Sequence, residues 1–122
     1  MEHTILVVED EQGIREAIGI YMKNQGYNVI LAANGKEGLE KIETNDIHLA
    51  IVDIMMPIMD GYEATIQIRK KDKKIPILAM SANAFVEDIM NSKVAGMNMH
   101  LAKPLDETKL IEALKQCKKD ED

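Results

Sequence analysis

Five short apolar runs, each too short to form a helix, alternate along the chain with longer segments of helical periodicity. The runs cover residues 5–8, 29–32, 49–52, 77–80 and, more weakly, 99–102. Their apolar residues follow one another without polar alternation, as in strands that helices cover on both faces. Strict alternation of strand and helix predicts parallel strands joined by right-handed crossovers. We therefore predict an α/β fold, a doubly wound, flavodoxin-like sheet of five parallel strands in the order 2-1-3-4-5, with five helices.

Characteristic residues mark the ends of the predicted helices. Asn34 and Asp60 each stand three positions before a glutamate, which is the spacing of a capping box, so we expect helices to begin after them. Gly26 is the expected left-handed cap at the end of the first helix. Gly96 is expected to close the fourth helix, and Asp106 to cap the last one.

Size and charge limit the classes of function. A chain of 122 residues fits one domain, so we expect residues 1–122 to form a single one, with a solvated tail or the start of a linker at 118–122. The net charge of -6 speaks against nucleic acid or an anionic membrane surface as the main partner. No apolar run approaches the roughly 18 residues of a membrane span, so we expect no membrane insertion. The single cysteine, Cys117, cannot form an internal disulfide, which fits a reducing, cytoplasmic location.

Residues that carry chemistry stand where the predicted strands end. Glu9 and Asp10 follow the first strand, Asp53 the third, Ser81 the fourth and Lys103 the fifth. In open parallel sheets, ligands bind beyond the carboxyl ends of the strands, at the point where the strand order reverses. In the predicted order that point lies between the first and third strands. We therefore expect three acids, a hydroxyl and an amine to converge on one small crevice.

The chemistry of such a cluster favours phosphoryl transfer. Three neighbouring carboxylates cannot all stay ionised without a compensating cation. Lys103 offers one positive charge, and carboxylate oxygens suit Mg²⁺ as the remaining cation. A carboxylate beside Mg²⁺ can act as a nucleophile toward phosphorus, which would give an aspartyl phosphate at Asp53. Ser81 and Lys103 would then hold the phosphoryl oxygens, and positioning of this kind accounts for most of phosphoryl-transfer catalysis.

Four short motifs at these positions resemble the signature of the receiver domains of bacterial two-component response regulators. They are VVED at 7–10, DIMMPIMDG at 53–61, MSAN at 80–83 and KP at 103–104. Each motif alone is weak, but the four together, in this order and spacing, are very specific, and they span nearly the whole chain.

The resemblance assigns a role to each candidate residue. It implies phosphorylation of Asp53 and contacts from Ser81 and Lys103 to the phosphoryl group. It also implies a set of Mg²⁺ ligands, which are Asp10, Asp53, Glu9 through water, and the backbone carbonyl of Met55.

The resemblance also implies a partner and a response. The phosphoryl donor would be a phosphohistidine on a histidine kinase or a histidine phosphotransfer domain. Ile14, Arg15 and Ile18 on the first helix would dock the helical bundle of that partner, unless Ile14 and Ile18 are simply buried in the core. Phosphorylation would switch the face built from the fourth helix, the fifth strand and the fifth helix. The chain would then be a phosphoacceptor in a phosphorelay that catalyses its own phosphoryl transfer, rather than an enzyme.

One position departs from the pattern of the family. Three residues before the lysine, receivers usually have Tyr or Phe, the switch aromatic, whereas this chain has His100. The segments SANAFVED and AGMNMHLAKPL are most similar to receivers fused to hybrid histidine kinases, where this histidine is familiar. Those receivers often have Asn after the first acidic pair, where this chain has Glu11 and Gln12. A hybrid kinase is therefore one of the possible origins of the chain.

Two other functions are compatible with the same fold. An aspartyl phosphatase usually has a second Asp two residues after the nucleophile, but this chain has Met55 there. A flavin-binding module needs a first loop that cradles phosphate, whereas Glu9, Asp10 and Glu11 would repel the phosphate of FMN. Taken alone, Asp53 could cap a turn. Together with the acids, the hydroxyl and the amine at the other strand ends, it favours the phosphoacceptor.

Overall fold

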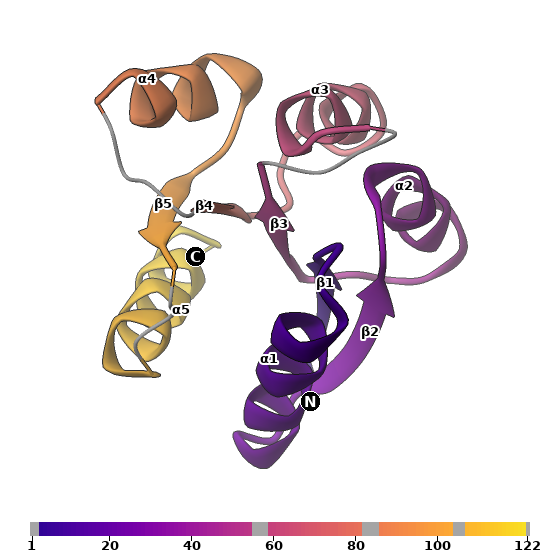
Figure 1. Cartoon of the computed structure of the whole chain (residues 1–122), viewed down its shortest axis with the longest axis vertical. Coiled ribbons are helices and arrows are strands. Elements are labelled where there is room, and N and C mark those ends of the chain that lie inside the picture. The colour runs from indigo at the N-terminus through magenta and orange to yellow at the C-terminus, as the bar shows by residue number, and fades with distance from the viewer. Residues whose placement is uncertain (1–2, 55–58, 82–85, 104–106, 122) are drawn as a thin grey trace.

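A central sheet of parallel strands runs through the molecule, with helices on both of its faces (Figure 1). The computed structural model describes residues 3–54, 59–81, 86–103 and 107–121. The strands are β1 (Thr4–Val8), β2 (Asn28–Ala32), β3 (Leu49–Asp53), β4 (Ile77–Ser81) and β5 (Met99–Ala102). The helices are α1 (Gln12–Asn24), α2 (Gly35–Thr44), α3 (Gly61–Lys71), α4 (Val86–Ala95) and α5 (Glu107–Glu121).

The sheet has the order β2-β1-β3-β4-β5, and every neighbouring pair of strands is parallel. Helices α1 and α5 cover one face, and α2, α3 and α4 lie on the other (Figure 1). The predicted doubly wound fold is therefore confirmed. In this order β1 and β3 are central neighbours, and the crossovers leave in opposite directions between them, so their carboxyl ends flank the crevice where such sheets bind ligands.

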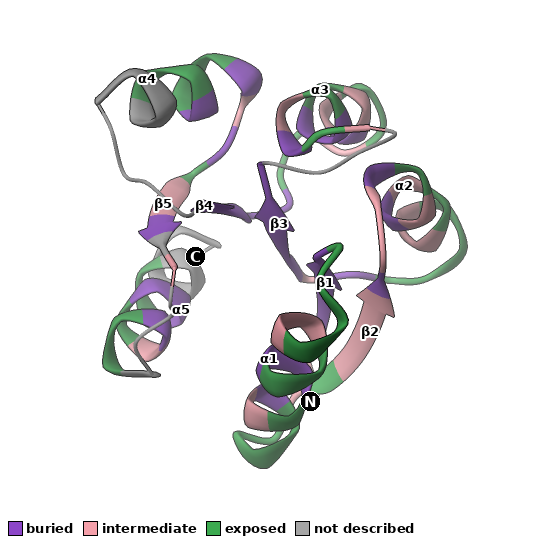
Figure 2. Cartoon of the chain, in the orientation of Figure 1, coloured by how far each residue is buried: buried purple, intermediate pink, exposed green. Residues whose placement is uncertain are grey.

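Alternate residues of each strand supply two hydrophobic cores. Ile5 and Val7 of β1 pack in the core that includes Leu114 of α5, whereas Leu6 packs in the core that includes Ile68 of α3. Strands β3 and β4 are buried along their whole length, as Figure 2 shows. Because both faces of the sheet are covered, the strands need apolar side chains at successive positions, which explains the uninterrupted apolar runs of the sequence.

Three predicted helix ends have the expected geometry. The backbone N–H of Glu37 donates to Oδ1 of Asn34 at 2.9 Å, and that of Glu63 donates to Oδ1 of Asp60 at 2.9 Å. These bonds satisfy amide groups that a helix leaves unpaired in its first turn. Gly26 has a φ of 94°, the left-handed conformation that was predicted for it.

The last helix differs from its predicted extent. The backbone of α5 is helical as far as Glu121, where the sequence predicted a solvated tail from Lys118. No Gly or Pro interrupts the segment, and Lys and Glu are good helix formers, so the helix continues as far as Glu121. The predicted cap at Asp106 lies outside the described residues. Among the described helices, none combines the length and the apolar character that crossing a bilayer requires.

Thr65 of α3 is a buried polar residue that tests the cost of an unpaired hydroxyl in the core. Its side chain is fully buried, and its Oγ1 has no hydrogen-bond partner among the described residues. Thr65→Val keeps the shape and removes the unpaired hydroxyl, so we expect the free energy of unfolding, measured in urea, to rise by about 1 kcal/mol. Thr44→Val is the matched control, because Thr44 is exposed and its Oγ1 donates to the carbonyl of Glu40 at 3.0 Å. A loss of stability in Thr65→Val would contradict the prediction.

Candidate functional site

The strand ends bring the predicted site residues to one edge of the sheet. Asp53 is the last residue of β3, and Ser81 is the last residue of the neighbouring β4. Glu9 follows β1, where its backbone N–H donates to the carbonyl of Ala32 at 3.1 Å. Lys103 follows β5, and its backbone N–H donates to the carbonyl of Ser81 at 2.7 Å. Backbone pairing therefore continues one residue past the ends of β1 and β5 and sets the direction of both side chains.

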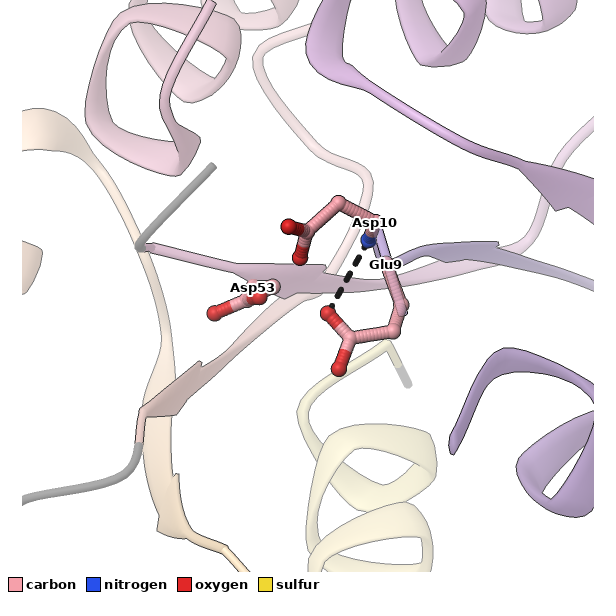
Figure 3. Close-up of side chains that lie close together, drawn as sticks. All are labelled: Glu9, Asp10 and Asp53. Atoms are coloured by element: carbon pink, nitrogen blue, oxygen red, sulfur yellow. Dashed lines mark hydrogen bonds between the residues drawn. The ribbon is translucent and has the colours of Figure 1, made fainter. Parts of the chain in front are cut away.

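The three acids form one cluster. Glu9, Asp10 and Asp53 each offer a carboxylate oxygen, and these oxygens lie within 4.8 Å of one another. Figure 3 shows the three side chains gathered at the carboxyl ends of β1 and β3. Glu9 and Asp53 are buried, with exposed fractions of 0% and 1%, whereas Asp10 is exposed to solvent. The cluster is therefore open on the side of Asp10 and closed on the side of the sheet.

Lys103 joins two of these carboxylates. Its Nζ lies 2.6 Å from Oε1 of Glu9 and 3.0 Å from Oδ2 of Asp53. Burial alone would lower the pKa of Lys103, but the hydrogen bonds and charges of Glu9 and Asp53 outweigh it and raise the pKa. The amine is therefore held as an ammonium group between the two acids.

The charge of Glu9 is poorly compensated by its surroundings. Burial, followed by the proximity of Asp53, raises the pKa of Glu9 to about 8, although Lys103 acts in the opposite direction. One ammonium group thus does not offset the acids around it. The donor set, which consists of hard carboxylate oxygens with an excess of negative charge, fits a divalent cation such as Mg²⁺. The predicted ligand Met55 lies outside the described residues.

Ser81 makes a contact that the sequence did not predict. Its side chain is buried, and its Oγ lies 2.9 Å from Nε2 of His100, which stands on β5 at the position of the usual switch aromatic. The hydroxyl that was predicted to hold a phosphoryl oxygen is thus linked to the neighbouring strand. In the register of β4 and β5, His100 is paired with Ala79, two residues before Ser81, so the two side chains lie on the same face of the sheet.

Gly61 is a second residue whose role was missed. A Cβ at Gly61 would lie 2.4 Å from the carbonyl oxygen of Asp53 and 2.6 Å from Cα of Ile54, closer than atoms can approach. The start of α3 therefore packs directly against the backbone that carries Asp53. The Asp60-Gly61 pair indicated a helix start, and the absent side chain of Gly61 was the only sequence signal for this close approach.

The comparisons with known proteins agree with the fold. The family model of the response regulator receiver domain matches residues 5–115. This match covers most of the chain, so the chain belongs to the family of response regulator receiver domains. Members of this family accept phosphoryl groups in two-component signalling.

Individual relatives are similar over nearly the whole chain. A probable transcriptional regulator, ycf29 of Porphyra purpurea, is 35% identical over 117 residues, which are 94% of this chain and 56% of the relative. The chemotaxis protein CheY4 of Vibrio cholerae superposes with a TM-score of 0.92 at 28% identity, over 96% of this chain and 99% of that one.

A third relative bears on the metal. The receiver domain of sensor histidine kinase PA1611 from Pseudomonas aeruginosa superposes with a TM-score of 0.87 at 34% identity, over 95% of this chain and 97% of that one. That structure has a magnesium ion coordinated in its active site cleft. The chain spans about half the length, or less, of the first curated relatives that it matches. The similarity therefore concerns the receiver domain of those longer proteins.

The raised pKa of Glu9 predicts how stability depends on pH. Glu9 keeps its proton in the folded protein up to about pH 8, whereas its ordinary pKa is 4.5. Between these values the unfolded chain binds fewer protons, so the stability of the metal-free protein falls as the pH rises from about 4.5 to 8. Urea unfolding in EDTA across this range measures the slope, and Glu9→Gln is expected to flatten it. The exposed Glu40→Gln is the control, and an equal slope in Glu9→Gln and the parent would refute the assignment.

The close approach at Gly61 predicts that a methyl group added at this position lowers the stability of the domain. Gly61→Ala forces the start of α3 away from Asp53, and we expect it to lower the free energy of unfolding by about 2 kcal/mol or more. Gly13→Ala is the matched control. Gly13 lies in α1 with no atom within 4 Å of the added Cβ, so alanine there is expected to stabilise the helix by about 0.5–1 kcal/mol. Similar urea midpoints for the two variants would show that the packing at Gly61 tolerates the methyl group.

Proposed function

We propose that Asp53 of this receiver domain accepts a phosphoryl group from a phosphohistidine, with Mg²⁺ held by Glu9, Asp10 and Asp53. The observation that carries the proposal is the position of Lys103, whose Nζ lies 3.0 Å from the Asp53 carboxylate inside a cluster of three acids. The donor is a histidine kinase or a histidine phosphotransfer domain, which places the reaction in the cytoplasm. The predicted role of the Met55 carbonyl as a further ligand belongs to the same proposal.

The residues of the chain divide the reaction among them. An Asp53 carboxylate oxygen attacks the phosphorus, the phosphorus–nitrogen bond breaks, and its electron pair leaves with the imidazole of the donor. An aspartyl phosphate results, so the domain is a phosphoacceptor that assists its own modification. Lys103 stays beside the phosphoryl group and balances its negative charge. The hydroxyl of Ser81 donates a hydrogen bond to a phosphoryl oxygen. Mg²⁺, when bound, would neutralise negative charge on the phosphoryl oxygens.

The contact between Ser81 and His100 supports a route from the phosphoryl group to the surface. If the Ser81 hydroxyl turns toward the phosphoryl oxygens, its 2.9 Å contact with Nε2 of His100 is lost. The imidazole on β5 is then released to adopt another orientation. We infer that the signal leaves the domain through the face of α4, β5 and α5, with His100 in the place of the usual switch aromatic.

Further features bear on the competing functions and on the origin of the chain. Two residues after Asp53 the sequence has Met55 in place of the general acid of an aspartyl phosphatase, which favours an acceptor over a hydrolase. The similarity to the receiver of a sensor histidine kinase supports a hybrid kinase as one origin. The net charge of -6 continues to speak against direct binding of nucleic acid.

Phosphorylation by a small donor tests the proposal without the unidentified kinase. Incubation with Mg²⁺ and acetyl phosphate is expected to add the mass of one phosphoryl group to the intact protein, as measured by mass spectrometry. Asp53→Asn is expected to abolish the gain, because the amide is not a nucleophile. Asp46→Asn removes an exposed acid far from the cluster and is expected to keep the gain. An unmodified parent, or a mass gain that persists in Asp53→Asn, would overturn the assignment.

The same samples report on the switch. With Mg²⁺ and a beryllofluoride mimic of the phosphoryl group, the NMR signals of the His100 ring are expected to shift in the parent and to stay in place in Asp53→Asn. Unchanged His100 signals in a parent that binds the mimic would show that phosphorylation does not act through His100.

A further inference from the structure

Arg15 reaches back from the first turns of α1 to the loop that carries two of the acids. Its Nη1 donates to the backbone carbonyl of Glu9 at 2.9 Å and to that of Asp10 at 3.4 Å. The side chain is half-buried. Among the described residues, no carboxylate lies within 4 Å of its guanidinium, and its hydrogen bonds join it to the loop backbone and not to the acidic side chains.

The start of α1 lacks the side-chain cap that α2 and α3 have. Helices α2 and α3 are capped by the side chains of Asn34 and Asp60, which bond to amide groups of the first turn. The residue before α1 is Glu11, and its side chain makes no capping hydrogen bond. The loop between β1 and α1 thus lacks the capping hydrogen bond that fixes the other two loops. The hydrogen bonds of Arg15 to the loop backbone take over this role.

We propose that Arg15 is a positioning residue for the cation site. It fixes the backbone of the β1–α1 loop so that the carboxylate of Asp10 stays within reach of Asp53 before a cation binds, whereas Glu9 is already oriented by its pairing with Ala32. The inference rests on the proposed function, because it concerns the same cluster. Without this tie the loop must be ordered when the cation binds, and the cost of that ordering lowers the affinity for the cation.

This role differs from docking of a partner, for which the sequence also marked Arg15. A docking residue acts only when the partner is present, whereas a positioning residue affects the binding of Mg²⁺ to the isolated domain. It also differs from a general effect of positive charge near the acids. Lys at position 15 keeps the charge but lacks the planar guanidinium and its reach, so it separates charge from geometry.

Calorimetric titration with Mg²⁺ tests the proposal directly. Arg15→Met removes the donors and keeps an apolar stem, and we expect it to weaken Mg²⁺ binding about tenfold, the lower end of the range for groups that orient metal ligands. Arg15→Lys is expected to recover part of the loss. Lys23→Met is the matched control, because Lys23 lies in the last turn of the same helix, and we expect parental affinity.

Unfolding in EDTA and in Mg²⁺ separates positioning from a merely structural role. We expect the rise in melting temperature caused by a fixed Mg²⁺ concentration to be smaller in Arg15→Met than in the parent, because ligand stabilisation follows affinity. Parental Mg²⁺ affinity in Arg15→Met, or full recovery in Arg15→Lys, would overturn the inference and leave the proposed function intact. A parent that binds no Mg²⁺ would overturn both.

Discussion

Three carboxylates gathered around one ammonium group are the constraint on which the rest of the structure depends. Glu9, Asp10 and Asp53 bring their oxygens within 4.8 Å of one another, and Lys103 contacts two of them. The three acids repel one another when all are ionised, so the packing of the rest of the domain must stabilise an arrangement that electrostatics opposes. The two cores on either side of β1 and β3 provide that stabilisation through buried apolar surface. The same repulsion that burdens the fold is what makes the cluster receptive to a divalent cation.

The fold followed from the sequence because local and global signals agree. Each strand is an apolar run bounded by helical periodicity, and the capping side chains of Asn34 and Asp60 mark where helices begin. Rules of handedness and connection then leave few arrangements for alternating strands and helices. The convergence of Glu9, Asp53 and Lys103 is a consequence of that topology, since parallel strands end at a common edge. Distant residues were therefore predictable as neighbours before any distance was known.

Contacts that depend on the reach of a side chain, or on how closely two backbones approach, were not predictable in this way. Residue spacing does not encode the rotamer that pairs Ser81 with His100, nor the one that brings Arg15 back to the loop. The role of Gly61 depends on how closely two backbones approach, since an added Cβ would lie 2.4 Å from the carbonyl oxygen of Asp53, and the sequence does not show this distance. The helical end of α5 was missed for another reason, because Lys and Glu are typical both of helices and of solvated tails.

Glu9 and Lys103 lie 94 positions apart in the chain, yet their side chains touch. During synthesis on the ribosome, β1 to β4 emerge before β5. The acids therefore have no contact with the ammonium group of Lys103 until nearly the whole domain has left the exit tunnel. An unfinished or prematurely terminated chain therefore carries Asp53 without the group that steadies it. The electrostatic balance of the cluster is therefore established only once the chain has folded through Lys103.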